Sequence, residues 1–327
     1  MFRMLLLPCL FPALIFAQAE SARLTGVVTD PAGAVVANAK ITFLHTATGI
    51  STSVQSNEEG RYFSLPLRIG EYRIEAQADG FKRTVRSGVV LELQQIAQLD
   101  LRLELGVTTE SIDVTADAPL LSTTDASQGQ VINNKRIVDM PLNGRNYVQL
   151  ALLSVGAVET ANGARFSTFS AAGQRAPQNN FMLDGIDNNN VQLAAQGRQA
   201  ETVQPSVDAI QEFKISTNSF SAEYGRATGA VVNATIKSGA NDLHGTVFEF
   251  LRNEKLDAKN FFDSPTSKRP PFKRNQYGFS LGGPIVRNKT FFFGDYEWTD
   301  VRESRTANNT IPTLAMPAAY FSAIRNI

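Results

Sequence analysis

The residue types that most often carry catalysis are scarce in this chain of 327 residues. It has two histidines, His45 and His244, and a single cysteine, Cys9, that lies close to the amino terminus. Zinc enzymes need grouped histidine and acidic ligands, and nucleophilic catalysis needs a base within reach of the nucleophile. Neither histidine is accompanied by such a group, and no clustered acid pair is present. We therefore expect no catalytic residue, no metal site and no cofactor.

The nearest approach to a metal-binding sequence is a run of oxygen-bearing side chains. Asp184 and Asp187 precede three consecutive asparagines, Asn188–Asn190. The spacing departs from that of an EF-hand loop, and no bidentate glutamate follows at the required offset. We interpret these residues as turn and loop formers.

A second kind of chemistry, strand addition to a partner protein, is suggested by a short extended segment. It is formed by Glu110, Ser111, Ile112, Asp113, Val114, Thr115 and Ala116. Ile112 and Val114 are one strand period apart, and Pro119 closes the stretch. Such a segment can add to the edge of a partner's sheet through backbone hydrogen bonds. The alternative is that residues 107–115 are a linker or the last strand of the domain before them.

The first residues predict export. Arg3 is followed by an apolar run, Leu5–Phe16, and then by Ala17, Gln18 and Ala19, a signal-peptidase site that would leave Glu20 at the mature amino terminus. Cys9 lies inside the apolar run and is no lipoprotein signal.

The 31 basic and 31 acidic residues form no basic stripe, so nucleic acid is not an expected partner. No later segment is apolar enough for a transmembrane helix, so a role in the membrane would require β-strands.

After the export signal, the chain divides into three zones of different composition, and the elements in these zones must position the residues discussed above. Residues 21–105 alternate between apolar and polar side chains and contain frequent turns, which predicts a β-sandwich. The expected strands are residues 23–29, 36–45, 61–65, 71–78 and 81–85 and two final strands that end at Leu105. Residues 106–243 are rich in glycine, asparagine and glutamine. There we expect a helix from Asn133 or Asn134 to Met140, a helix over 145–153, one helical turn at 207–210, and strands at 213–216 and 229–237.

The third zone, residues 244–327, carries a heavy aromatic load on alternating strands. These are expected at 246–251, 277–282 and 290–298. The connection over 252–276 is long and that over 283–289 is short, as in outer-membrane barrels with long extracellular loops and short periplasmic turns. A soluble sandwich shows similar alternation.

Two resemblances give these zones an interpretation. The stretches at 24–30, 60–62, 70–72 and 78–81 resemble the carboxypeptidase regulatory-like domain, an immunoglobulin-like accessory sandwich that implies no peptidase. The segment 110–116 resembles the TonB box of TonB-dependent outer-membrane receptors, and eleven further residues resemble that family's plug domain. These are Asn143, Gly144, Arg145, Asn146, Asp184, Gly185, Glu223, Tyr224, Gly225, Gly229 and Asn233. With the sandwich in front, the arrangement is similar to the Oar-like subgroup.

The resemblance implies a mainly β chain of five parts. They are a signal peptide (1–19), an immunoglobulin-like β-sandwich (20–105), a TonB-box-like linker (106–119), an α+β plug domain (120–243) and the first strands of an incomplete outer-membrane β-barrel (244–327). Barrels of this type close about 22 strands around the plug. The residues after His244 suffice for about three strands at roughly ten residues each. We therefore expect this chain to be part of a receptor.

The implied function is energy-coupled uptake of an unidentified ligand across the outer membrane, with the inner-membrane TonB complex and outer-membrane lipid as partners. The alternative is a secreted or periplasmic β-sandwich module for binding or adhesion, for example to carbohydrate. A zinc carboxypeptidase is a more distant alternative.

Overall fold

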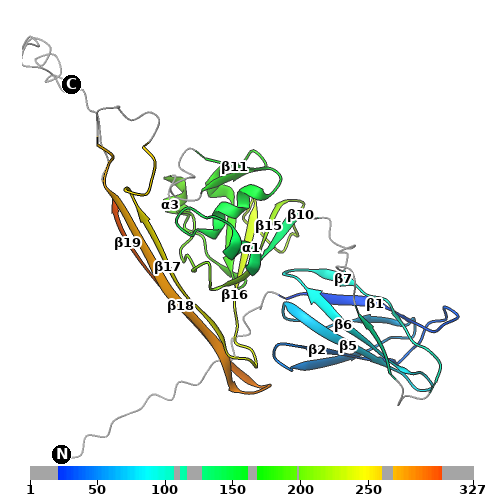
Figure 1. Ribbon diagram of the computed structural model, residues 1–327. Coiled ribbons are helices and arrows are strands. Elements are labelled where there is room, and N and C mark those ends of the chain that lie inside the picture. The colour runs from blue at the N-terminus through cyan, green and yellow to red at the C-terminus, as the bar shows by residue number, and fades with distance from the viewer. Residues whose placement is uncertain are drawn as a thin grey trace, which may run out of the picture. The chain divides into compact units, whose positions relative to one another are not determined.

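The computed structural model describes residues 21–106, 111–115, 127–160, 168–196, 199–259 and 268–303 (Figure 1). The chain is mainly β, as the sequence predicts, and its strands fall into three groups. In these residues no helix has the length and apolar character that a membrane crossing requires.

The amino-terminal module consists of two sheets. One contains β1 (Arg23–Thr29), β4 (Arg61–Phe63), β7 (Ile96–Gln98) and β8 (Leu101–Arg102). The other has the order β3-β2-β5-β6-β9, with β3 at Ser51–Gln55, β2 at Lys40–His45, β5 at Gly70–Gln77, β6 at Arg83–Leu91 and β9 at Ser111–Thr115. We did not expect β3, nor β7, which lies between the two final strands that we expected.

Alternation of side chains builds the core of this module, because successive residues of a strand point to opposite faces. On β5, Tyr72, Ile74 and Ala76 are buried and the residues between them are not. They belong to a single apolar cluster to which both sheets contribute. The Tyr62 hydroxyl is buried in it and donates a 2.6 Å hydrogen bond to the carbonyl of Leu99. The two sheets therefore share one hydrophobic core.

The middle module is built on a mixed five-stranded sheet with the order β10-β15-β16-β13-β14. The strands are β10 (Gln128–Asn133), β15 (Ile210–Asn218), β16 (Val231–Ile236), β13 (Asn180–Leu183) and β14 (Ile186–Asp187). A small hairpin, β11 (Ala157–Glu159) and β12 (Phe169–Ala171), lies apart from that sheet. The elements α1, η1, η2 (Ala176–Gln178) and α3 (Val191–Ala195) complete the module.

The expected helices of this module are confirmed in part. α1 spans Asn134–Asp139, and the Asn133 side chain caps it by accepting from the Arg136 amide at 3.1 Å. The element at 147–153 forms, but as a 3-10 helix, η1 (Tyr147–Leu153). The helical turn expected at 207–210 was wrong, since residues 207–209 form a non-helical turn that leads directly into β15.

The third group is a sheet of long strands with the order β17-β18-β19, a simple meander (Figure 1). β17 spans His244–Asn253, β18 spans Phe272–Val286 and β19 spans Thr290–Glu303. Along β18, Gln276 and Ser280 are buried, whereas Tyr277, Phe279 and Leu281 are 41–50% exposed. β18 therefore has one polar, buried face and one apolar, exposed face.

Candidate functional site

A buried ion pair lies at the centre of the polar contacts of the middle module. Asn146 accepts at 2.9 Å from the Val148 amide at the start of η1, and the turn before it passes through Gly144 and Arg145, both with positive φ. This turn directs the Arg145 guanidinium to Asp208, whose carboxylate it pairs with. Both side chains are less than 10% exposed. Because a buried charge without its partner is costly, Arg145 and Asp208 depend on each other.

Asp208 also connects the middle module to the long strands. Its other carboxylate oxygen accepts from the Thr246 hydroxyl on β17 at 3.3 Å, and Thr246 is 2.8 Å from the Ser280 hydroxyl on β18. Close by in sequence, the Ser206 hydroxyl donates to Asp295 on β19 at 2.9 Å. We call these six residues the anchor cluster: Arg145, Ser206, Asp208, Thr246, Ser280 and Asp295. They bond the middle module to β17, β18 and β19 through side chains alone.

Lys237 follows β16 and stands near the anchor cluster. Burial lowers the pKa of its ammonium group, and the charges of Asp208 and Asp295 act in the opposite direction. A cation beside two carboxylates offsets part of their mutual repulsion.

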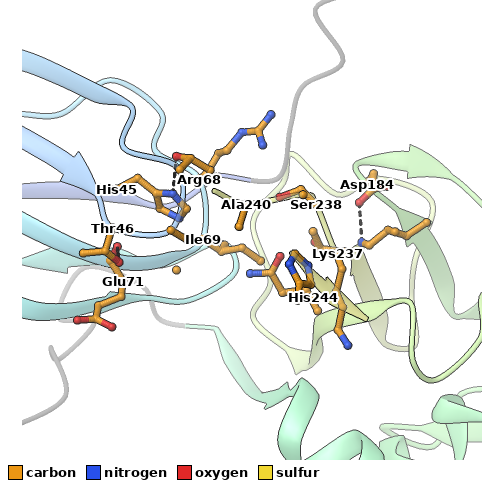
Figure 2. A pocket seen from close by; sticks show the side chains of 17 residues that line it. His45, Thr46, Arg68, Ile69, Glu71, Asp184, Lys237, Ser238, Ala240 and His244 are labelled. Carbon is orange, nitrogen blue, oxygen red and sulfur yellow. Dashed lines mark hydrogen bonds between the residues drawn. The ribbon is translucent and has the colours of Figure 1, made fainter. Parts of the chain in front are cut away.

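Asp184 and Gly185 form the turn between β13 and β14, and both have positive φ. The Asp184 carboxylate accepts from the Ile236 amide at 2.9 Å, as the dashed line in Figure 2 shows, and so ties this turn to the end of β16. Asp187 accepts from the Asn189 amide at 2.9 Å and pairs with Arg226 at 2.7 Å. Both carboxylates therefore bond protein donors, which agrees with our interpretation of these residues as turn formers.

Gly229 lies where the chain approaches Asn179 most closely. A β-carbon at position 229 would be 2.3 Å from the Asn179 side-chain oxygen. That oxygen accepts from the Ala230 amide at 2.9 Å, and the Asn179 amide group donates to the Phe169 carbonyl at 2.9 Å. A β-carbon at Gly225, by contrast, would meet no atom within 4 Å.

The remaining predicted plug residues are spread over the module. Asn143 exchanges two hydrogen bonds with Gln149, at 3.2 and 3.0 Å. Glu223 and Tyr224 belong to a turn whose amides bond Ser221 at 3.3 and 3.0 Å. Asn233 on β16 is 1% exposed, and its amide group has no hydrogen-bond partner among the described residues. The plug motif is thus a set of structural positions and not one site.

The sequence analysis did not single out three buried acids of the middle module, Glu201, Asp208 and Glu212. Glu201 is 3% exposed and accepts a hydrogen bond from the Tyr147 hydroxyl of η1. Burial raises the pKa of Glu201 to about 7, although the bond from Tyr147 lowers it. Nothing in the flanking sequence marks Glu201, whereas Asp208 stands between Val207, Ala209 and Ile210, and an acid within an apolar run is a usable signal.

The segment that resembles a TonB box forms β9, which pairs in parallel with β6 of the amino-terminal module. The register runs from Arg83 opposite Ser111 to Ser87 opposite Thr115. Its outer residues Glu110 and Ala116 lie outside the described residues, as do Ala17, Ala19 and Glu20 of the predicted signal cleavage site.

Comparison with known proteins matches both ends of the chain to families. Residues 23–104 match the carboxypeptidase regulatory-like domain, and residues 235–327 match the outer membrane beta barrel domain. The TonB-dependent transporter Oar of Myxococcus xanthus is 27% identical over 313 residues, which cover 89% of this chain. The chain is a homologue of TonB-dependent transporters.

As a TonB-dependent transporter homologue, the chain spans 28% of the length of Oar. Among solved structures, it is similar to the outer membrane transporter YddB from Escherichia coli (16% identity, TM-score 0.41, covering 49% of this chain and 24% of that one). It is also similar to the siderophore receptor PirA from Acinetobacter baumannii (20% identity, TM-score 0.39, covering 54% and 26%). The barrel-domain match and the similarity to Oar support an outer-membrane location, and Oar itself is a transporter rather than an enzyme.

Proposed function

We propose that this chain supplies the amino-terminal domain, the plug and the first barrel strands of a receptor for energy-coupled uptake across the outer membrane. The observation that carries the proposal is the similarity to Oar, which extends over 313 residues and covers 89% of this chain. In this proposal residues 20–105 are an immunoglobulin-like sandwich, 106–119 a linker with a TonB box at Glu110–Ala116, 120–243 the plug, and 244–327 barrel strands.

The polar composition of the middle module supports its assignment as a plug. The lumen of an outer-membrane barrel is polar and its lipid face apolar. The anchor cluster links the module to Thr246, Ser280 and Asp295 of β17–β19 with hydroxyl and carboxylate groups, while Tyr277, Phe279 and Leu281 occupy the face of β18 opposite to Ser280. A plug held by a few side-chain hydrogen bonds can be loosened without breaking the backbone ladder of the barrel.

The mechanism we infer is mechanical. A ligand binds on the extracellular side, the inner-membrane TonB complex adds a strand to the box-like segment, and a pull on that segment rearranges the plug. No step breaks or forms a covalent bond.

Binding of the purified chain to the carboxy-terminal domain of TonB, measured by calorimetry in detergent, tests the proposal. Val114→Pro removes a backbone donor at the centre of the segment, and Val114→Ala retains it. If strand addition supplies the affinity, the proline variant should bind at least about tenfold more weakly than the alanine variant, a loss of roughly 1.4 kcal/mol. Equal affinities of the two variants, or no binding by the unchanged chain, would contradict the proposed coupling.

A further inference from the structure

The second sheet of the amino-terminal module is closed by the same segment that resembles a TonB box. β6 pairs with β5 on one side, and its other side is covered over Arg83–Ser87 by β9. The sheet order β3-β2-β5-β6-β9 makes β9 the last strand. Without β9, the backbone groups of β6 along this stretch would form an open sheet edge, which is a ready template for another strand.

This pairing is slightly shorter than the other ladder of β6, which has six register pairs. The pairing with β9 has five register pairs and ends at Ser87, immediately before Gly88, whose φ is +76°. The antiparallel ladder with β5 continues past Gly88 to Leu91. Parallel pairing is slightly less stable per residue than antiparallel pairing. Of the two ladders of β6, the one with β9 is therefore the less costly to open.

The formal charges of the two paired stretches are complementary. The stretch of β6 contains Arg83 and Arg86 and no acid, whereas β9 contains Asp113 and no base and is preceded by Glu110. Opposite charges favour one partner over others. Arg83 also pairs with Glu75 of β5 at 3.5 Å, so its side chain is held close to this edge of the sheet.

We propose that the edge of β6 is a dock that holds the box-like segment, as β9, while no partner is bound. To bind the segment, a partner strand must take the place of β6 as the neighbour of β9. This inference rests on the proposed function for the identity of the partner, the TonB domain. Docking lowers the apparent affinity for that partner, because only the undocked fraction of the segment is competent to bind. The module thus holds the segment until TonB competes for it.

A disulfide trap tests the dock in the full chain. With Cys9 replaced by serine, the pair Ser87→Cys and Thr115→Cys occupies matched register positions. The pair Ser87→Cys and Val114→Cys is the control, since a shift of one residue turns a side chain to the opposite face. We expect the matched pair to cross-link under mild oxidation in severalfold higher yield than the control. Equal yields would overturn the dock.

The same variant separates this inference from the proposed function. Oxidised matched-pair protein should bind the TonB domain at least about tenfold more weakly than the reduced protein, with affinity restored by dithiothreitol. Excess TonB domain added before oxidation should lower the cross-link yield. If oxidised and reduced protein bind the TonB domain equally well, β6 and TonB do not compete for the segment, and the dock is refuted while the proposed coupling to TonB is kept. If neither binds while the matched pair still cross-links, the coupling fails and β9 is simply the last strand of the module.

Discussion

At the scale of single residues, the buried carboxyl group of Glu201 gives the middle module a dependence on pH. Its pKa is raised to about 7 by burial, from an ordinary value of 4.5. The unfolded chain therefore loses this proton at lower pH than the folded chain does. The stability that the protonated group supports is fully present below about pH 4.5 and is lost as the pH rises through about 7.

Glu201→Gln should remove the part of this dependence that comes from Glu201, because the amide oxygen can still accept the bond from Tyr147 but does not ionise. Glu212 on β15, whose pKa burial also raises to about 7, keeps its own part in the variant. Each pKa unit corresponds to about 1.4 kcal/mol, so the variant should be more stable at pH 8 by up to about 3 kcal/mol and unchanged at pH 4. Hydrogen exchange of peptides from η1 and β15 at both pH values measures the difference. Glu223→Gln, in an exposed turn, is the control. A gain of equal size at pH 4 and pH 8 would contradict a titration of Glu201.

At the scale of elements, the entry of the chain into β16 depends on a contact that only glycine allows. Ala at position 229 would collide with the Asn179 side chain and so disturb the hydrogen bonds to Ala230 and Phe169. Leaving buried polar groups unpaired costs about 1–3 kcal/mol. We expect Gly229→Ala to lower the free energy of unfolding by that amount in urea titrations followed by circular dichroism.

The matched control lies four residues earlier in the same motif. A β-carbon at Gly225 meets no neighbour, so Gly225→Ala should change stability by less than about 0.5 kcal/mol. If the two variants unfold at the same urea concentration, the close approach at Gly229 does not matter for stability.

The sequence predicted elements wherever side-chain alternation was strong. Tyr72, Ile74 and Ala76 identified β5 because every second residue is apolar. β3 was not predicted, because Ser51–Gln55 contains only one apolar residue, Val54. A half-exposed edge strand of this kind shows little alternation of apolar and polar side chains. The 3-10 form of η1 also escaped, since apolar spacing over two turns does not distinguish it from an α-helix.

The candidate sites were less predictable than the elements. The parallel pairing of β9 with β6 joins stretches that are separated along the chain, and no local pattern specifies such a partner. The link from Asp208 to Thr246 depends in the same way on tertiary structure. Resemblance identified Arg145 as a motif residue, but only the structure pairs it with Asp208.

At the scale of the whole molecule, the proposed receptor and the alternative of a soluble binding module differ in what covers the exposed aromatic face of β18 and β19. Phe279 and Tyr296 are half exposed on that face, with ring centroids 6.2 Å apart. In an outer-membrane barrel this face contacts lipid, and in a soluble module it would face water or a protein partner.

Single cysteines introduced at these positions distinguish the two cases in outer-membrane preparations of cells that express the whole receptor of which we expect this chain to be part. We expect Phe279→Cys and Tyr296→Cys to react with a lipid-soluble maleimide and to resist a membrane-impermeant one, because hydrocarbon excludes the charged reagent. Glu59→Cys, in an exposed turn of the amino-terminal module, should react with both reagents once the vesicles are opened. Reaction of Phe279→Cys with the impermeant reagent at the rate of Glu59→Cys would mean that water reaches the aromatic face. The sheet would then not be part of a barrel wall, and the soluble binding module would become the better account of the chain.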